Sequence, residues 1–139
     1  MAYWLMKTEP EEFSWDDQVK RGAKGEPWSG VRNFTARRYL KEMKKGEKFF
    51  FYHTGEEKQI VGIGEIIREA FHDPSAGKDE PWVAVQTGAI KPLPNPVTLA
   101  TIKATAKLKD MPLVKYARLS VQPVSDAEWK LICKMGGLK

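Results

Sequence analysis

The sequence has few of the residues on which disulfides, metal centres and nucleophilic catalysis depend. A single cysteine, Cys133, excludes an intramolecular disulfide and any thiol-rich zinc site. The two histidines, His53 and His72, show no metal-ligand spacing, and the chain contains neither a phosphate-cradling glycine loop nor a nucleophile elbow. We therefore expect no metal and no cofactor, and nothing in the sequence supports an enzyme.

Long apolar runs are missing as well. No run approaches the roughly 18 residues that a membrane span requires. The first residues, MAYWLMKTEP, lack the charged segment, the apolar segment and the cleavage site of a secretory signal. We expect a cytoplasmic protein with no membrane segment.

Positive charge and aromatic side chains are better represented. Lys and Arg number 23 against 18 Asp and Glu, which gives a net charge of +5 and a pI near 9.3. This excess moderately favours nucleic acid or another polyanion as the partner. Five Trp, six Phe and four Tyr within a hydrophobic fraction of 42% suffice for a proper core. We predict a single domain over residues 1–139.

Runs of β-branched and aromatic residues bounded by turn residues predict the strands. They are residues 3–7, the two arms of a hairpin around TGEEKQ, residues 82–90 and residues 117–124. The segment KPLPNP has three prolines and is predicted to end the third of these regions. Gly62 and Gly64 would lie on one face of the hairpin's second arm. They either let the sheet bend or admit the close approach of a ligand or another backbone.

Helix signals separate these strands. The expected N-caps are Ser14, Asn33 and Ser125, and a weaker helix is expected at residues 97–108. The helix after Asn33 is predicted to bury one face, made of Phe34, Ala36, Tyr39, Leu40 and Met43. Strands broken by short helices predict an α+β domain built on a small curved sheet or barrel.

The stretch WSGVRNFTARRYL, which begins at Trp28, is the most informative about function. A flat ligand needs an apolar face to stack on and a few directed polar groups at its edge. Trp28 could supply the face, and Ser29 and Asn33 could supply the edge. Positive charge for a phosphate would come from the arginines of this stretch, Arg32, Arg37 and Arg38. Since most tryptophans are buried, a core position for Trp28 is the alternative.

Long segments of the chain closely resemble one known family. They are YWLMKTEPEEFSWDD, WSGVRNFTARRYLKEMKKGEKFFFYHTG, IVGIGEI, PWVAVQ and RLSVQPVSDAEW, in that order. On these segments the chain is identified as a member of the EVE domain family. The resemblance implies a PUA-like fold, a small mixed β-barrel with peripheral helices, similar to the YTH domains that read methylated adenine in RNA. It also implies a reader of a modified base, because EVE domains are associated with modified cytosines in DNA.

The resemblance assigns expected roles to particular residues. Comparison with the YTH cage puts one aromatic at Trp28 and a second at Trp82. Tyr52, His53 and Arg118 match family segments that are expected to face the pocket. The expected base-binding pocket is Trp28, Ser29, Val31, Asn33, Tyr52, His53 and Trp82, and the expected phosphate-contacting rim is Lys7, Arg32, Arg37, Arg38 and Arg118.

Three classes of function follow from these observations. The leading one is a non-enzymatic module that binds nucleic acid containing a modified base, with a modified cytosine in DNA favoured. The second is an RNA-binding module, as PUA and YTH relatives are. The third is an enzyme that acts on a small ligand in the same pocket, which the missing catalytic residues disfavour.

Overall fold

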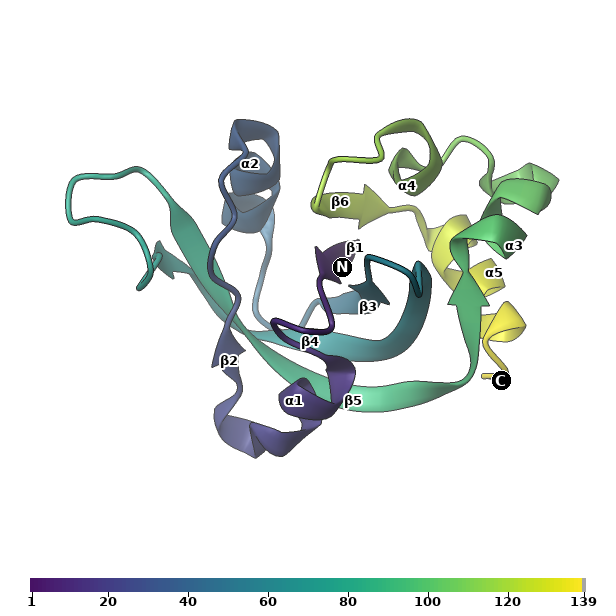
Figure 1. Ribbon diagram of the computed structural model, residues 1–139, viewed down its shortest axis with the longest axis horizontal. Coiled ribbons are helices and arrows are strands. Elements are labelled where there is room, and N and C mark those ends of the chain that lie inside the picture. The colour runs from purple at the N-terminus through teal and green to yellow at the C-terminus, as the bar shows by residue number, and fades with distance from the viewer. Residues whose placement is uncertain (139) are drawn as a thin grey trace.

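The computed structural model describes residues 1–138, and a six-stranded sheet lies at its centre (Figure 1). The strands are β1 (Tyr3–Thr8), β2 (Glu26–Pro27), β3 (Lys48–His53), β4 (Gln59–His72), β5 (Val83–Thr98) and β6 (Val121–Val124). Their order across the sheet is β2-β5-β4-β3-β1-β6. β1 runs parallel to β3, and the other neighbouring strands are antiparallel.

The predicted α+β class is confirmed, but the sheet does not close into the predicted barrel. In the described residues the edge strands β2 and β6 span two and four residues and do not pair with each other. Closure needs a continuous ladder between the edges, which strands so short cannot supply. The curvature comes instead from β4 and β5, whose pairing shifts register at several points between Ile60 and Phe71.

Five α-helices flank the sheet in this part of the chain, and the three predicted N-caps are confirmed. The helices are α1 (Trp15–Lys20), α2 (Phe34–Glu42), α3 (Leu99–Ala104), α4 (Pro112–Lys115) and α5 (Asp126–Met135). Ser14 and Ser125 each form a capping box, and the Asn33 side chain accepts a hydrogen bond from the Ala36 amide. On α2, Ala36 and Leu40 are buried as expected, but Phe34 is 64% exposed and lies outside the predicted core face.

Three boundaries differ from the sequence prediction. β5 continues through KPLPNP because β2 pairs only with Gln86 and Thr87, so the proline segment lies on a free edge. The helix predicted at 97–108 is split at Thr105 into α3 and a 3₁₀ turn. The last strand begins at Val121, because the preceding residues form a turn in which the Leu119 amide donates to the Tyr116 carbonyl at 3.0 Å.

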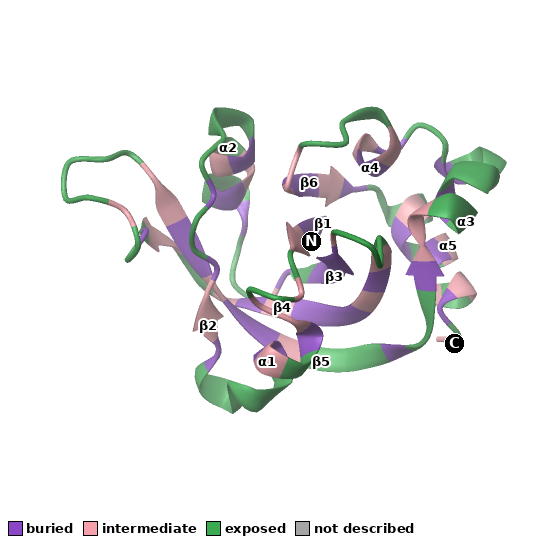
Figure 2. Cartoon of the chain, in the orientation of Figure 1, coloured by how far each residue is buried: buried purple, intermediate pink, exposed green. Residues whose placement is uncertain are grey.

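The buried hydrophobic residues among 1–138 form two clusters, one on each face of the sheet. Figure 2 shows that many of the buried positions lie along the strands. The alternation of side chains along β3 divides the two clusters. Phe50 and Tyr52 enter the cluster that includes Trp129 of α5. Phe49 and Phe51 enter the other cluster, which also holds the Trp28 ring. The cluster with Phe49 and Phe51 therefore packs against the segment that begins at Trp28.

Gly62 and Gly64 allow aromatic rings of the core to approach β4 closely. A Cβ atom at Gly62 would lie 2.7 Å from the Trp15 ring, and one at Gly64 would lie 2.5 Å from the Phe49 ring. Both glycines therefore make room for the protein's own side chains rather than for a ligand.

Candidate nucleic-acid interface

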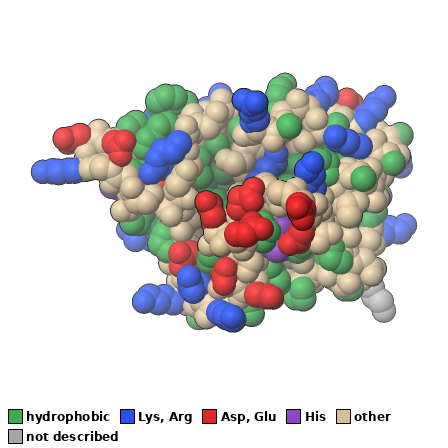
Figure 3. All heavy atoms as spheres, viewed as in Figure 1, with side chains coloured by type: hydrophobic (Ala, Val, Ile, Leu, Met, Phe, Trp, Pro, Cys, Tyr) green, Lys and Arg blue, Asp and Glu red, His purple; other side chains and the backbone are tan. Residues whose placement is uncertain are grey.

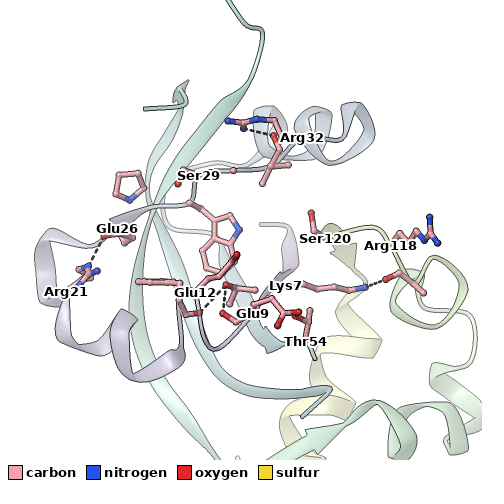
Figure 4. Close-up of a pocket in the computed structure, with 17 residues that line it drawn as sticks. Lys7, Glu9, Glu12, Arg21, Glu26, Ser29, Arg32, Thr54, Arg118 and Ser120 are labelled. Carbon is pink, nitrogen blue, oxygen red and sulfur yellow. Dashed lines mark hydrogen bonds and ion pairs between the residues drawn. The ribbon is translucent and has the colours of Figure 1, made fainter. Parts of the chain in front are cut away.

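A cavity of about 540 Å³ opens at the end of β1 (Figure 4). Its walls come from the start of the β1–α1 connection, the segment 26–32, Thr54 after β3 and the turn before β6. Of the residues predicted for a pocket or its rim, the cavity brings together six, which are Lys7, Trp28, Ser29, Val31, Arg32 and Arg118.

Trp28 lies at the boundary between this cavity and the core. Its ring is 6% exposed and makes edge-on contacts with Phe13, Phe49 and Phe51 at centroid distances of 6.2, 5.7 and 5.4 Å. Its backbone amide donates to the Val85 carbonyl at 2.8 Å. Trp28 is thus a core residue that also lines the cavity, which combines the two alternatives that the sequence left open.

The loop after Trp28 is held by a carboxylate that sequence analysis missed. Asp73 is fully buried and accepts hydrogen bonds from the Gly30 amide at 2.8 Å, the Arg32 guanidinium at 3.0 Å and both the amide and hydroxyl of Ser75 at 2.7 Å. Burial by itself raises the pKa of Asp73, but these hydrogen bonds outweigh it and leave the pKa lowered. The HDPS segment contains a recognisable turn signal, but nothing local indicates that its carboxylate reaches Gly30.

Lys7 crosses one end of the cavity. Its ammonium group donates to the Ala117 carbonyl at 2.9 Å and lies 5.8 Å from the centre of the Tyr52 ring. Burial lowers the pKa of Lys7. Figure 4 shows Lys7 extended toward the turn that carries Arg118, whose guanidinium points away from the cavity. Lys7 therefore fixes this turn as well as adding positive charge.

Acidic residues line the cavity beside the basic ones. Figure 3 shows that acidic side chains gather in the middle of the face it presents, with Lys and Arg side chains around them. Glu9 accepts a hydrogen bond from the Thr54 hydroxyl at 2.6 Å, and Glu26 pairs with Arg21 at 2.8 Å. The lining thus combines four cations with three carboxylates, which are Lys7, Arg21, Arg32 and Arg118 against Glu9, Glu12 and Glu26.

Four of the seven residues predicted for the base pocket lie elsewhere, and three of these are Tyr52, His53 and Asn33. Tyr52 is buried on the opposite face of the sheet, where burial raises the pKa of its hydroxyl to about 12. The His53 Nε2 atom accepts a hydrogen bond from the Trp15 amide at 3.0 Å, and its Nδ1 lies 2.9 Å from a Glu57 carboxylate oxygen. Asn33 caps α2 and lines an adjacent groove of about 560 Å³ together with Arg118 and two tyrosines.

The remaining predicted residues lie along α2 and the loop between β4 and β5. Trp82 is half-buried, packs against Phe34 and does not line the cavity. Arg38 is exposed and lies 3.7 Å from Glu42. Arg37 lies one position before it with its guanidinium over the Phe34 ring. The predicted pairing of Trp28 with Trp82 in one cage is therefore not formed around this cavity.

The cavity therefore combines a mainly polar and charged lining with a few apolar side chains, among them Phe13, Trp28 and Val31. The chain belongs to the EVE domain family, which matches residues 2–135. Human thymocyte nuclear protein 1 is 32% identical over 165 residues, covering 96% of this chain and 73% of that protein.

Solved structures agree with this assignment. A protein of Agrobacterium tumefaciens is 45% identical and superposes with a TM-score of 0.97, covering 99% of this chain and 94% of its own. Human THYN1, crystallised in complex with 5-methylcytosine-containing DNA, is 32% identical with a TM-score of 0.88, covering 100% of this chain and 99% of its own. A YTH domain of Zygosaccharomyces rouxii, 17% identical with a TM-score of 0.59 over 97% of this chain and 86% of its own, shares the fold.

Two features are absent from residues 1–138. In this range no helix has both the length and the apolar character needed to cross a membrane. No group of three or more His, Cys, Asp or Glu side chains in the same range is placed to hold a metal ion.

Proposed function

We propose that this protein is a nucleic-acid-binding module without enzymatic activity that takes a modified nucleobase, above all a modified cytosine of DNA, into the cavity beside Trp28. The observation that carries the proposal is this cavity, found in a chain whose relative THYN1 was crystallised with DNA containing 5-methylcytosine. Because the likeness extends over nearly the whole of both chains in that comparison, it favours the same class of ligand.

The size and lining of the cavity suit a base. Its volume lies within the range of about 300–1,000 Å³ that is typical of small-ligand sites. Phe13, Trp28 and Val31 offer apolar contact to a ring, and the hydroxyls of Ser29 and Ser120 can hydrogen-bond to its polar edge. A stacked base gains roughly 1–3 kcal/mol from an aromatic partner. Since Trp28 is largely covered by its neighbours, we expect a contribution near the lower end of that range.

The binding free energy that a modification adds determines how strongly the module can prefer the modified base over the unmodified one. A methyl group that fills an apolar space adds about 0.8 kcal/mol, which is a modest preference over the unmodified base. An oxidised mark can be read more sharply, because a dedicated hydrogen bond is lost with the unmodified base. Extracting a base from a duplex costs a few kcal/mol, so we expect single strands and damaged sites to bind more tightly than intact duplex.

The absence of catalysis is part of the proposal. None of the described residues that line the cavity is a cysteine or a histidine, and Glu9 and Lys7 are already engaged by Thr54 and Ala117. Incubation with a panel of modified nucleosides, followed by mass spectrometry, tests this directly. We expect every nucleoside to be recovered unchanged, and a product formed in proportion to the protein would contradict the proposal.

Binding is tested with matched oligonucleotides. Fluorescence anisotropy compares single-stranded DNA carrying one cytosine, 5-methylcytosine, hydroxymethylcytosine or formylcytosine at the same position, and calorimetry measures the corresponding nucleosides. We expect at least one modified form to bind more tightly than cytosine. Equal affinity for all forms would contradict base recognition, and tighter binding of the matched RNA would favour the RNA-binding alternative.

A further inference from the structure

Two aromatic side chains meet on the surface next to the cavity. Phe34 is the first residue of α2, and Trp82 directly precedes β5. Their ring centroids lie 4.9 Å apart with an angle of 35° between the planes. Phe34 is 64% exposed, so its ring presents a free apolar surface beside Trp82. Trp82 is half-buried.

Arginine side chains flank both rings. The Arg32 guanidinium carbon lies 5.7 Å from the centre of the Trp82 ring, and that of Arg37 lies 5.8 Å from the centre of the Phe34 ring. None of the carboxylates described in residues 1–138 forms an ion pair with Arg37. Its positive charge is therefore not offset by an ion pair in this part of the chain.

The aromatic pair is rigidly connected to the cavity. Arg32 lines the cavity and also lies against Trp82, and the ion pair with Asp73 fixes its position. The Asp73 amide donates to the Trp82 carbonyl at 3.0 Å, which closes the loop between β4 and β5 at its base. Hydrophobic side chains gather beside α2 in Figure 3, with a basic side chain next to them. The cavity and the aromatic pair thus share one framework.

We propose that Phe34 and Trp82, with Arg32 and Arg37, form a second binding site on which an unpaired base stacks, the neighbour in the strand of the base held in the cavity. This inference rests on the function proposed above. Exposed aromatic rings beside arginines are the features by which proteins bind single-stranded nucleic acid, because every base offers a π face and every linkage a phosphate. An extruded base leaves its neighbour unstacked, and the exposed Phe34 ring can take the place of the lost partner.

The test removes the ring that stacking requires. Phe34→Ala should weaken binding of a single-stranded oligonucleotide with one modified cytosine by about 5- to 150-fold, the equivalent of roughly 1–3 kcal/mol for one stacked base. Phe34→Tyr should keep the affinity. Ile90→Ala removes a 39% exposed apolar side chain from β5 and is the matched control, for which we expect no change.

A second arm identifies what the ring contacts. An oligonucleotide with an abasic position next to the modified cytosine lacks the stacking base, so it should bind the wild type as weakly as the intact oligonucleotide binds Phe34→Ala. The variant should then show no further loss on the abasic oligonucleotide. The second site would be overturned if the loss from Phe34→Ala and the loss from the abasic position were additive, whether that position precedes or follows the modified cytosine. It would also be overturned if Phe34→Ala had no larger effect than Ile90→Ala.

The free nucleoside separates this inference from the proposed function. If the modified nucleoside binds and Phe34→Ala leaves its affinity unchanged while weakening the oligonucleotide, both proposals are supported. If the nucleoside binds and the oligonucleotide is indifferent to Phe34→Ala, only the second site fails. If modified and unmodified strands bind equally but Phe34→Ala weakens both, the cavity proposal fails and the aromatic pair stands as a site for single strands. If no oligonucleotide binds, both are overturned.

Discussion

The carboxylate of Asp73 accepts a hydrogen bond at 2.8 Å from the amide of Gly30, which lies 43 residues earlier in the chain. Gly30 has a positive φ of 85°, so the loop takes a turn there that few other residues adopt. The same carboxylate oxygen also accepts from Arg32. One buried group therefore sets the conformation of the loop that forms a wall of the cavity.

Replacing this carboxylate should loosen the loop and weaken base binding. Asp73→Asn keeps the size of the side chain but removes the charge, so we expect a loss of about 1–3 kcal/mol in the free energy of unfolding. Asp79→Asn changes an exposed residue of the same loop and should have little effect. Urea unfolding measures the stability, and nucleoside calorimetry measures the binding. Equal behaviour of the two variants would show that Asp73 does not position the loop.

Acid should remove the contributions of two buried carboxylates. Burial by itself raises the pKa of Glu47, but hydrogen bonds from the Lys44 amide, the Trp4 indole and the Ala2 amide outweigh it, and its pKa is lowered, as it is for Asp73. A lowered pKa means that the folded state binds the proton more weakly than the unfolded chain does. The stability from each group is therefore complete above the usual carboxyl pKa of about 4 and is lost as the pH falls through the folded-state value.

This acid dependence can be assigned to Glu47 with one variant. Glu47→Gln should be less stable than the wild type at pH 7, and its unfolding midpoint in urea should change less between pH 5 and pH 3. The difference between the two proteins should then narrow toward low pH, where the wild type loses the same interactions. A difference that stays constant over the whole range would contradict the assignment.

Trp28 is a poor choice for testing the cavity because of its place in the core. Trp28→Ala should lower the free energy of unfolding by about 3–5 kcal/mol, as expected for a buried tryptophan. Trp129→Ala, which removes a buried ring from the other face of the sheet, should cost a similar amount. Thermal or urea unfolding of the two variants compares them. A nearly normal stability of Trp28→Ala would show that its ring serves the ligand rather than the core.

Filling the cavity from its rim is a cleaner test. Ser29 is exposed and lines the cavity, so Ser29→Phe should obstruct it at little cost in stability. We expect the modified nucleoside to lose most of its affinity in calorimetry, with an unchanged unfolding midpoint. Ala127→Phe adds the same ring to an exposed position on α5 and should bind normally. Normal nucleoside binding by Ser29→Phe would place the base elsewhere.

The parts of the fold that sequence analysis predicted are those that local chemistry determines. Ser14 and Ser125 cap their helices through residues three positions away, so both ends are readable from short stretches. The course of β5 through its prolines depends on which edge of the strand is free, and that is a property of the whole sheet. The contact of Asp73 with Gly30 likewise depends on the whole fold, and no local sequence pattern predicts it.

The same distinction between local and long-range determinants applies to the residues predicted for the candidate site. Three of the residues predicted for the base pocket, Trp28, Ser29 and Val31, line the cavity together because they lie in one continuous segment. Tyr52 and His53 are neighbours on a strand, so their side chains point to opposite faces and cannot both face one pocket. In the structure neither lines the cavity, and each is tied to a different part of the core.

The salt dependence of binding tests whether the basic residues of α2 contact phosphates. Each phosphate contact adds a slope of about −0.7 for single strands to the logarithmic salt plot. Arg37 and Arg38 follow Phe34 on α2, and the protein is small, so we expect a total slope of roughly −2 to −4 for a single-stranded oligonucleotide. The modified nucleoside has no phosphate, and its affinity should hardly change with salt.

Charge reversal at Arg37 and Arg38 tests whether these two residues cause the salt dependence of oligonucleotide binding. The double variant Arg37→Glu, Arg38→Glu should weaken oligonucleotide binding and reduce the salt slope while leaving the nucleoside affinity unchanged. Lys130→Glu, Lys134→Glu reverses two exposed charges on α5, beyond the opposite face of the sheet, and controls for net charge. Three carboxylates offset the four cations in the cavity lining, so we expect additional phosphate contacts at the basic residues of α2. An equal loss in both double variants would mean that net charge attracts the strand and that α2 makes no phosphate contact of its own.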